Sequence, residues 1–178
     1  VSIPAGAVTD PGGNGNSAST NTDNIVTYLD GIGPNVQVLN TSPETADHVL
    51  SSAEVVTFNI DSFTVKFNQD VYNVSSADPN FGDSVTNPAN YMLIKDLGDT
   101  AGLQTASCAG GAVEPADLKR PIGTVTYDNT TYTATFTVNS GLPLPNGDYH
   151  LFICGTTSIV DPLNNALALV GSNGAGSD

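Results

Sequence analysis

The sequence is poor in basic, sulfur-containing and large aromatic side chains. It contains no tryptophan, one methionine and two cysteines, and only four of its 178 residues are lysine or arginine. Eighteen aspartates and glutamates accompany them, which gives a formal net charge of −14 at pH 7. So few cations cannot form the basic stripe that phosphate groups require, so nucleic acid is excluded as a partner. The acidic residues are dispersed, which is typical of a solvated protein surface.

Long apolar runs and catalytic motifs are also missing from the sequence. No stretch approaches the 18 or more apolar residues of a membrane span, so we expect no membrane insertion. The two histidines, His48 and His150, are far apart, no Cys/His cluster has zinc spacing, and no Gly-x-Ser-x-Gly motif occurs. No set of residues stands out as a nucleophile with its general acid or base. The chain is therefore not expected to be an enzyme.

The abundant residues favour an all-β fold. Threonine and valine suit strands, glycine, asparagine, aspartate and proline suit turns, and no long stretch has helical periodicity. Short strands are expected at 36–39, 55–71, 91–93, 124–127, 132–138 and 149–153, with a long loop between Asp96 and Pro121. This spacing predicts an antiparallel β-sandwich. The inward positions predict its core: Phe63, Val65, Phe67, Tyr91, Leu93, Val125, Phe136, Val138, Leu151 and Ile153.

One phrase occurs twice in the chain. Residues 8–14 and 159–165 both read apolar-x-Asp-Pro-x-(Gly/Asn)-Asn, and the two copies are 151 residues apart. That spacing is about one domain length rather than the period of a solenoid. The repeat therefore indicates a chain cut from, or built like, a tandem array of modules, which are more often structural than catalytic.

The two repeated turns are the only candidate ligand sites. Asp10 with Asn14, and Asp161 with Asn165, place side-chain oxygens four residues apart in tight turns. Calcium takes six to eight such oxygens, so these residues are calcium candidates. The alternative is that Asp and Asn close the turns by bonding their own backbone, since neither turn has the spacing of an EF-hand loop.

The two cysteines, Cys108 and Cys154, have one obvious use. A lone pair in a lysine-poor chain rich in threonine and asparagine predicts a single disulfide, formed in an oxidising compartment. Such a bridge would fasten the long 96–121 loop to the strand at 149–153. The alternative is two buried thiols.

Several phrases in order carry a resemblance to a known family. They are Asn87-Pro88-Ala89-Asn90-Tyr91 before a strand, a Thr-x-Thr hairpin, Leu142-Pro143, Gly147-Asp148-Tyr149-His150-Leu151, and Ile159-x-Asp161-x-x-x-Asn165-x-Leu167. Residues 34–167 resemble the bacterial Ig-like domain found in tandem in S-layer proteins, adhesins and large secreted surface proteins. One departure is Asn164, where the family usually has glycine before the asparagine. Asparagine tolerates the left-handed backbone that glycine would supply, so the turn can survive.

The resemblance implies an Ig-like sandwich over residues 34–178, preceded by an N-terminal strand segment over residues 1–33. It implies a structural, extracellular role, as a repeat or subunit of a cell-surface filament, S-layer or adhesin. The partners would be copies of the chain or neighbouring Ig-like repeats, joined head to tail. The alternative function is a polysaccharide-binding module of a large secreted enzyme, which would need an exposed aromatic strip from Tyr72, Tyr91 and Tyr127.

The segment after the first turn predicts how copies would join. Family members run on past this turn into a final strand, and the strand at 24–29 begins 14 residues after Asp10. The equivalent strand after Asp161 would begin near residue 175, at the end of the given sequence. We therefore expect residues 1–29 to donate a strand to the vacant edge of a neighbouring copy. The donor residues would be Ile25, Val26, Thr27, Tyr28 and Leu29. The alternative is that residues 1–30 are the tail of a preceding domain in a longer protein.

Overall fold

The computed structural model describes residues 4–18, 31–98, 103, 105, 108, 117–155 and 159–167. The chain divides into two compact units, Val1–Asp30 and Gly31–Asp178, so the division falls three residues before the boundary that the sequence predicts. The strand expected at 24–29 lies outside the described residues.

The second unit consists of short strands joined by turns. The strands are β1 (Val36–Ser42), β2 (Ser62–Phe67), β3 (Tyr91–Asp96), β4 (Asp117–Arg120), β5 (Ile122–Asp128), β6 (Thr133–Val138) and β7 (Asp148–Ile153). Single 3₁₀ turns, η1 (Phe81–Asp83), η2 (Pro88–Asn90) and η3 (Asn139–Gly141), are the only helices among the described residues. None of them is long or apolar enough to cross a membrane.

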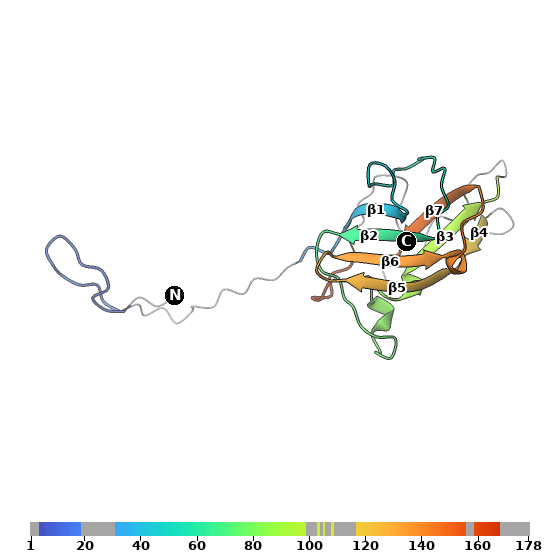
Figure 1. The fold of residues 1–178 in the computed structure, drawn as a ribbon. Helices are drawn as coiled ribbons and strands as arrows, with labels where there is room; N and C mark the ends of the chain where they lie inside the picture. Colours follow the sequence, from blue (N-terminus) through green and yellow to red (C-terminus); the bar gives the residue numbers. More distant parts are fainter. Residues whose placement is uncertain are drawn as a thin grey trace. The chain divides into compact units, whose positions relative to one another are not determined.

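The strands form two antiparallel sheets packed face to face, in the order β1-β2-β6-β5 and β4-β3-β7 (Figure 1). The prediction of an all-β sandwich is therefore confirmed. An immunoglobulin constant-type sandwich has strands A, B, E and D in one sheet and C, F and G in the other. In chain order, β1, β2, β6 and β5 take the places A, B, E and D, while β3 and β7 take C and F. The strand β4 is added beside β3, and no described strand takes the place of G beside β7.

The core between the sheets is built from the inward side chains of the paired strands. Phe63 lies opposite Phe136 across β2 and β6, and the ring centre of Phe136 lies 4.6 Å from that of Tyr91 on the other sheet. Eight of the ten predicted core residues are buried. Leu151 and Ile153 of β7 are only half-buried, which corrects the prediction for that strand. β7 is at the edge of its sheet, so no described strand covers these two side chains on the side away from β3.

The outer face of the three-stranded sheet is covered too. Met92 and Ile94 of β3 point away from the core, yet they are 2 % and 0 % exposed. The segment before β4 is anchored on this face at two points. The backbone N–H and the hydroxyl of Thr105 donate to Asp117 Oδ2 at 2.6 and 2.7 Å, and a disulfide follows three residues later. The loop between β3 and the next strand is shorter than the predicted 96–121, because β4 occupies the last part of that range.

The disulfide joins Cys108 to Cys154, the residue directly after β7, with the two Cα atoms 5.9 Å apart. This is the pairing that the cysteine count predicts. Cys154 is 3 % exposed, and its side chain lies on the same face of the sheet as Met92 and Ile94. The bridge therefore holds the segment containing Cys108 against the outer face of this sheet.

Candidate functional site

The first Asp-Pro turn lies in the N-terminal unit and closes on itself. Thr9 and Gly15 form a β-bridge. The carboxylate of Asp10 accepts the backbone N–H groups of Gly12 and Asn14 on Oδ1, both at 2.9 Å, and the Asn14 amide on Oδ2 at 3.0 Å. Gly13 has φ of 84°, a left-handed conformation in which glycine has no Cβ to clash. The sequence Asp-Pro-x-Gly-Asn therefore encodes a turn that needs no outside partner.

The second turn repeats this geometry 151 residues later. Val160 and Ala166 form the bridge, and Asp161 takes the place of Asp10. Its Oδ1 accepts the N–H groups of Leu163 and Asn165 at 2.9 and 2.8 Å, and its Oδ2 accepts the Asn165 amide at 2.8 Å. The residue before that asparagine, Asn164, has φ of 68°. Asparagine thus adopts the left-handed conformation that the first turn gives to glycine, as the sequence predicts.

The two turns differ in what surrounds them. In the second turn Ile159, Asp161 and Leu167 are 0 %, 2 % and 6 % exposed, so this turn closes one end of the sandwich core. In the first turn Val8, at the position of Ile159, is 62 % exposed. The same hydrogen-bonded hairpin thus occurs once seated on a core and once with its apolar position open to solvent.

The second turn is contacted by residues that are distant from it in sequence. Gln69 donates from Nε2 to Asp161 Oδ2 at 3.3 Å and to the carbonyl of Ile32 at 3.1 Å. A Cβ atom on Gly33 would lie 1.7 Å from the carbonyl oxygen of Ala166, so only glycine fits at this point. The segment that leads into β1 and the second turn therefore lie against each other at one end of the sandwich.

Hydrogen bonding within the first turn shifts the acidity of its carboxylate. The pKa of Asp10 is lowered from its ordinary value of 3.8, first by the Asn14 side chain and then by the backbone N–H of Asn14. Desolvation opposes this shift, and the N–H of Gly12 adds to it. Because every one of these hydrogen bonds is donated to the charged form, the carboxylate is stabilised as an anion inside its own turn.

This bond pattern favours turn closure over calcium binding. The amides of Asn14 and Asn165 direct their nitrogens, not their oxygens, at the carboxylates. The described residues hold no group of three or more His, Cys, Asp or Glu side chains that could bind a metal ion. Calcium binding at these turns stays a prediction, and it would require both asparagine side chains to rotate.

The three tyrosines of the alternative function do not form an exposed strip. Tyr91 is 1 % exposed and donates to the carbonyl of Val85 at 2.9 Å. Tyr127 is half-buried and donates to Asp70 Oδ1 at 2.8 Å, and burial raises the pKa values of both phenols. Only Tyr72 remains, itself half-buried. The donor residues 25–29 lie outside the described residues.

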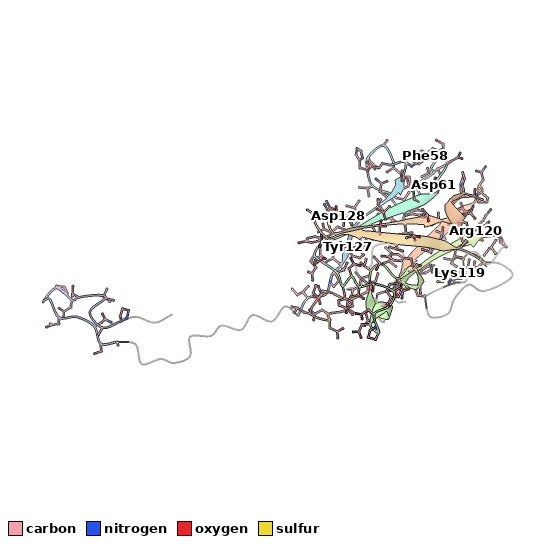
Figure 2. The ribbon with its side chains drawn as sticks, turned by 60° about the horizontal axis from the view of Figure 1, so that its bottom comes forward. Phe58, Asp61, Lys119, Arg120, Tyr127 and Asp128 are labelled. Atoms are coloured by element: carbon pink, nitrogen blue, oxygen red, sulfur yellow. A yellow bond between two sulfur atoms is a disulfide. The ribbon has the colours of Figure 1, made fainter. Side chains whose placement is uncertain are left out.

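A shallow hollow lies on the β5–β6 hairpin, at the end of the sheet where Figure 2 labels Tyr127 and Asp128. It has a volume of about 470 Å³ and is lined by Thr126, Tyr127, Asp128, Thr131, Thr133 and Thr135. In the sequence this Thr-x-Thr pattern indicates a hairpin and contributes to the family resemblance, but it does not indicate a binding site. The lining offers hydroxyls and one carboxylate, without a base or nucleophile pair.

Comparison with known proteins gives little more. No protein-family model and no curated protein matches the sequence. A crystal structure of an S-layer protein is similar at a TM-score of 0.39 and 17% identity, over 77% of this chain. The chain spans 12% of that protein chain's length. A likeness at this level does not establish a shared function.

Proposed function

We propose that the chain is a structural module of an extracellular surface protein, a repeat or subunit of a filament, S-layer or adhesin. One observation carries the proposal. The Asp-Pro hairpin occurs twice with matching hydrogen bonds, once seated on this sandwich and once in the unit that precedes it. Among the described residues of the first unit, 4–18, the hairpin packs on no sandwich, which fits a chain whose modules follow one another.

The chemistry of the chain supports an extracellular location. A disulfide persists where the surroundings are oxidising, and this one anchors a covering segment rather than a reactive site. The net charge of −14 keeps copies soluble before they meet. Both features suit a secreted protein with a structural role.

The proposed mode of joining is strand donation. Residues 25–29 would supply a strand to a neighbouring copy, with main-chain hydrogen bonds giving affinity and alternate side chains filling the edge. Such a head-to-tail contact uses two different surfaces and does not close on itself, so it generates a filament.

Sedimentation of the full chain over a range of concentrations tests this mode. Thr27→Pro removes a main-chain donor from the centre of the proposed strand and should abolish assembly. The control, Thr20→Pro, lies in the preceding stretch of serine, threonine and asparagine and should assemble like the wild type. A full chain that stays monomeric at high concentration would rule out the filament, and equal assembly of both variants would rule out strand donation by this segment.

A further inference from the structure

The outer edge of β7 presents main-chain groups with no described strand beside them. Cys154 donates its N–H to the carbonyl of Asn90 at 2.9 Å, so the even-numbered residues of β7 face β3. The N–H and C=O groups of Tyr149, Leu151 and Ile153 therefore point the other way. Among the described residues, β3 alone pairs with β7.

The side chains of the same three residues show that the core is incomplete along this edge. Tyr149, Leu151 and Ile153 pack against the core but are only half-buried. Their neighbours on β3, Tyr91 and Leu93, are 1 % and 0 % exposed. Another strand beside β7 would remove apolar surface from water and would pair main-chain groups that no described residue pairs.

The other three sheet edges are protected in ways that β7 is not. β4 has only four residues, carries Lys119 and is followed by Pro121; Figure 2 labels Lys119 and Arg120 on it. β1 and β5 have irregular registers, and the carbonyl of Leu39 in β1 already accepts the N–H of Leu50. Short strands, lysine, proline and bulges discourage edge pairing. β7 has six residues, an unbroken register with β3, and neither lysine nor proline.

We propose that this edge is the acceptor site for residues 24–29 of a second copy, which pair antiparallel to β7. The inference rests on the proposed function and deepens it by naming the acceptor edge and the strand direction. In an immunoglobulin sandwich, the strand that follows the turn after strand F pairs with strand F. The second Asp-Pro turn here follows β7, and residues 24–29 are the strand-like segment that follows its copy.

Chain length excludes the chain's own residues 24–29 as an antiparallel donor. Gly33 lies against Ala166, and Leu167 lies against Gly155, so the segment leading into β1 starts from the Ile153 end of β7. An antiparallel donor would place Leu29 at the Asp148 end of β7. That end lies about 17 Å from the Ile153 end, at 3.3 Å per residue. The four residues from Leu29 to Gly33 span at most about 14 Å. A strand from the same chain could therefore pair with β7 only in parallel.

Mixing singly substituted full chains tests both the edge and the direction. One chain carries Asp148→Cys, at the exposed start of β7, and the other carries either Asp30→Cys or Asn24→Cys. The antiparallel arrangement should cross-link Asp148→Cys to Asp30→Cys and not to Asn24→Cys, because the donor ends are about 20 Å apart and a disulfide needs Cα atoms within about 7 Å. The control acceptor, Thr124→Cys on β5, should link to neither. Mass analysis identifies the linked peptides and the intact native disulfide.

Amide exchange supplies a second readout that needs no new cysteine. The N–H groups of Tyr149, Leu151 and Ile153 should exchange rapidly in dilute protein and about tenfold or more slowly after assembly. Slow exchange in the dilute monomer would show that the chain's own residues cover the edge, and would overturn the proposal.

The outcomes separate this inference from the proposed function. If the chain assembles but links through Thr124→Cys, or through Asn24→Cys, the acceptor edge or the direction is wrong while strand donation stands. If no variant assembles and β7 shows no added protection, the filament and the acceptor site are both rejected.

Discussion

At the scale of single residues, Asp10 and Asp161 perform the same bonding in different surroundings. Each carboxylate accepts two backbone N–H groups and one asparagine amide from its own turn. Asp161 is 2 % exposed and also accepts a bond from Gln69, whereas Asp10 is exposed. The sequence motif determines the hydrogen bonding of the turn. Residues elsewhere in the chain determine whether the turn packs against the core.

Alanine at each aspartate separates these two contributions. Asp161→Ala should lower the free energy of unfolding of the sandwich by about 2–3 kcal/mol, because donors near the core lose a charged acceptor. Asp10→Ala is the matched control and should leave the urea midpoint of the sandwich unchanged. Equal effects of the two substitutions would contradict the difference in seating that the structure shows.

The first turn should also respond to acid. The folded pKa of Asp10 is lowered, so folding of the turn favours the anion. The stabilisation is complete above the ordinary value of 3.8 and is lost as pH falls through the lowered folded value. NMR signals of the Gly12 and Asn14 amides should therefore move toward unfolded positions only below about pH 3.8. Asp10→Asn should remove this dependence, and an unchanged transition in that variant would assign it to another group.

At the scale of elements, the alternating pattern predicted the strands that have one buried face. It failed where burial has another cause. Met92 and Ile94 are buried on the outer face because a segment distant in sequence is anchored there, which periodicity within β3 cannot reveal. β4 was missed because its sequence, Asp-Leu-Lys-Arg, is mostly charged. The predicted strand over 55–71 shrank to Ser62–Phe67, the part that pairs with β1 and β6.

Removal of the disulfide should loosen this covered face. The double variant Cys108→Ser, Cys154→Ser should lose about 2–4 kcal/mol of stability, as expected for a bridge that closes a long loop. Denaturation of the oxidised, reduced and double-variant proteins under one set of conditions measures the difference, and reduced wild type should match the variant. Equal stability of all three proteins would show that the anchored segment stays in place without the bridge.

At the scale of the whole molecule, the sequence predicted the sandwich and the repeated turn because both are encoded in short, contiguous patterns. It did not predict which turn is packed on the core, since two residues that contact the second turn, Gln69 and Gly33, are 90 or more residues away from Asp161. The open edge of β7 was likewise out of reach, because it depends on the order of strands in the sheet. The proposed joining of copies therefore rests on the structure for its acceptor and on the sequence for its donor.

The disulfide also determines how the module would respond to a pulling force. The strands β4, β5, β6 and β7 all lie between Cys108 and Cys154, which are 46 residues apart. Fully extended, that stretch would measure about 150–165 Å. While the bridge is intact, tension passes from one sulfur to the other and this length cannot be drawn out. In the proposed filament, each unfolded module would therefore lengthen by about 150 Å less when oxidised than when reduced, so the bridge would limit extensibility.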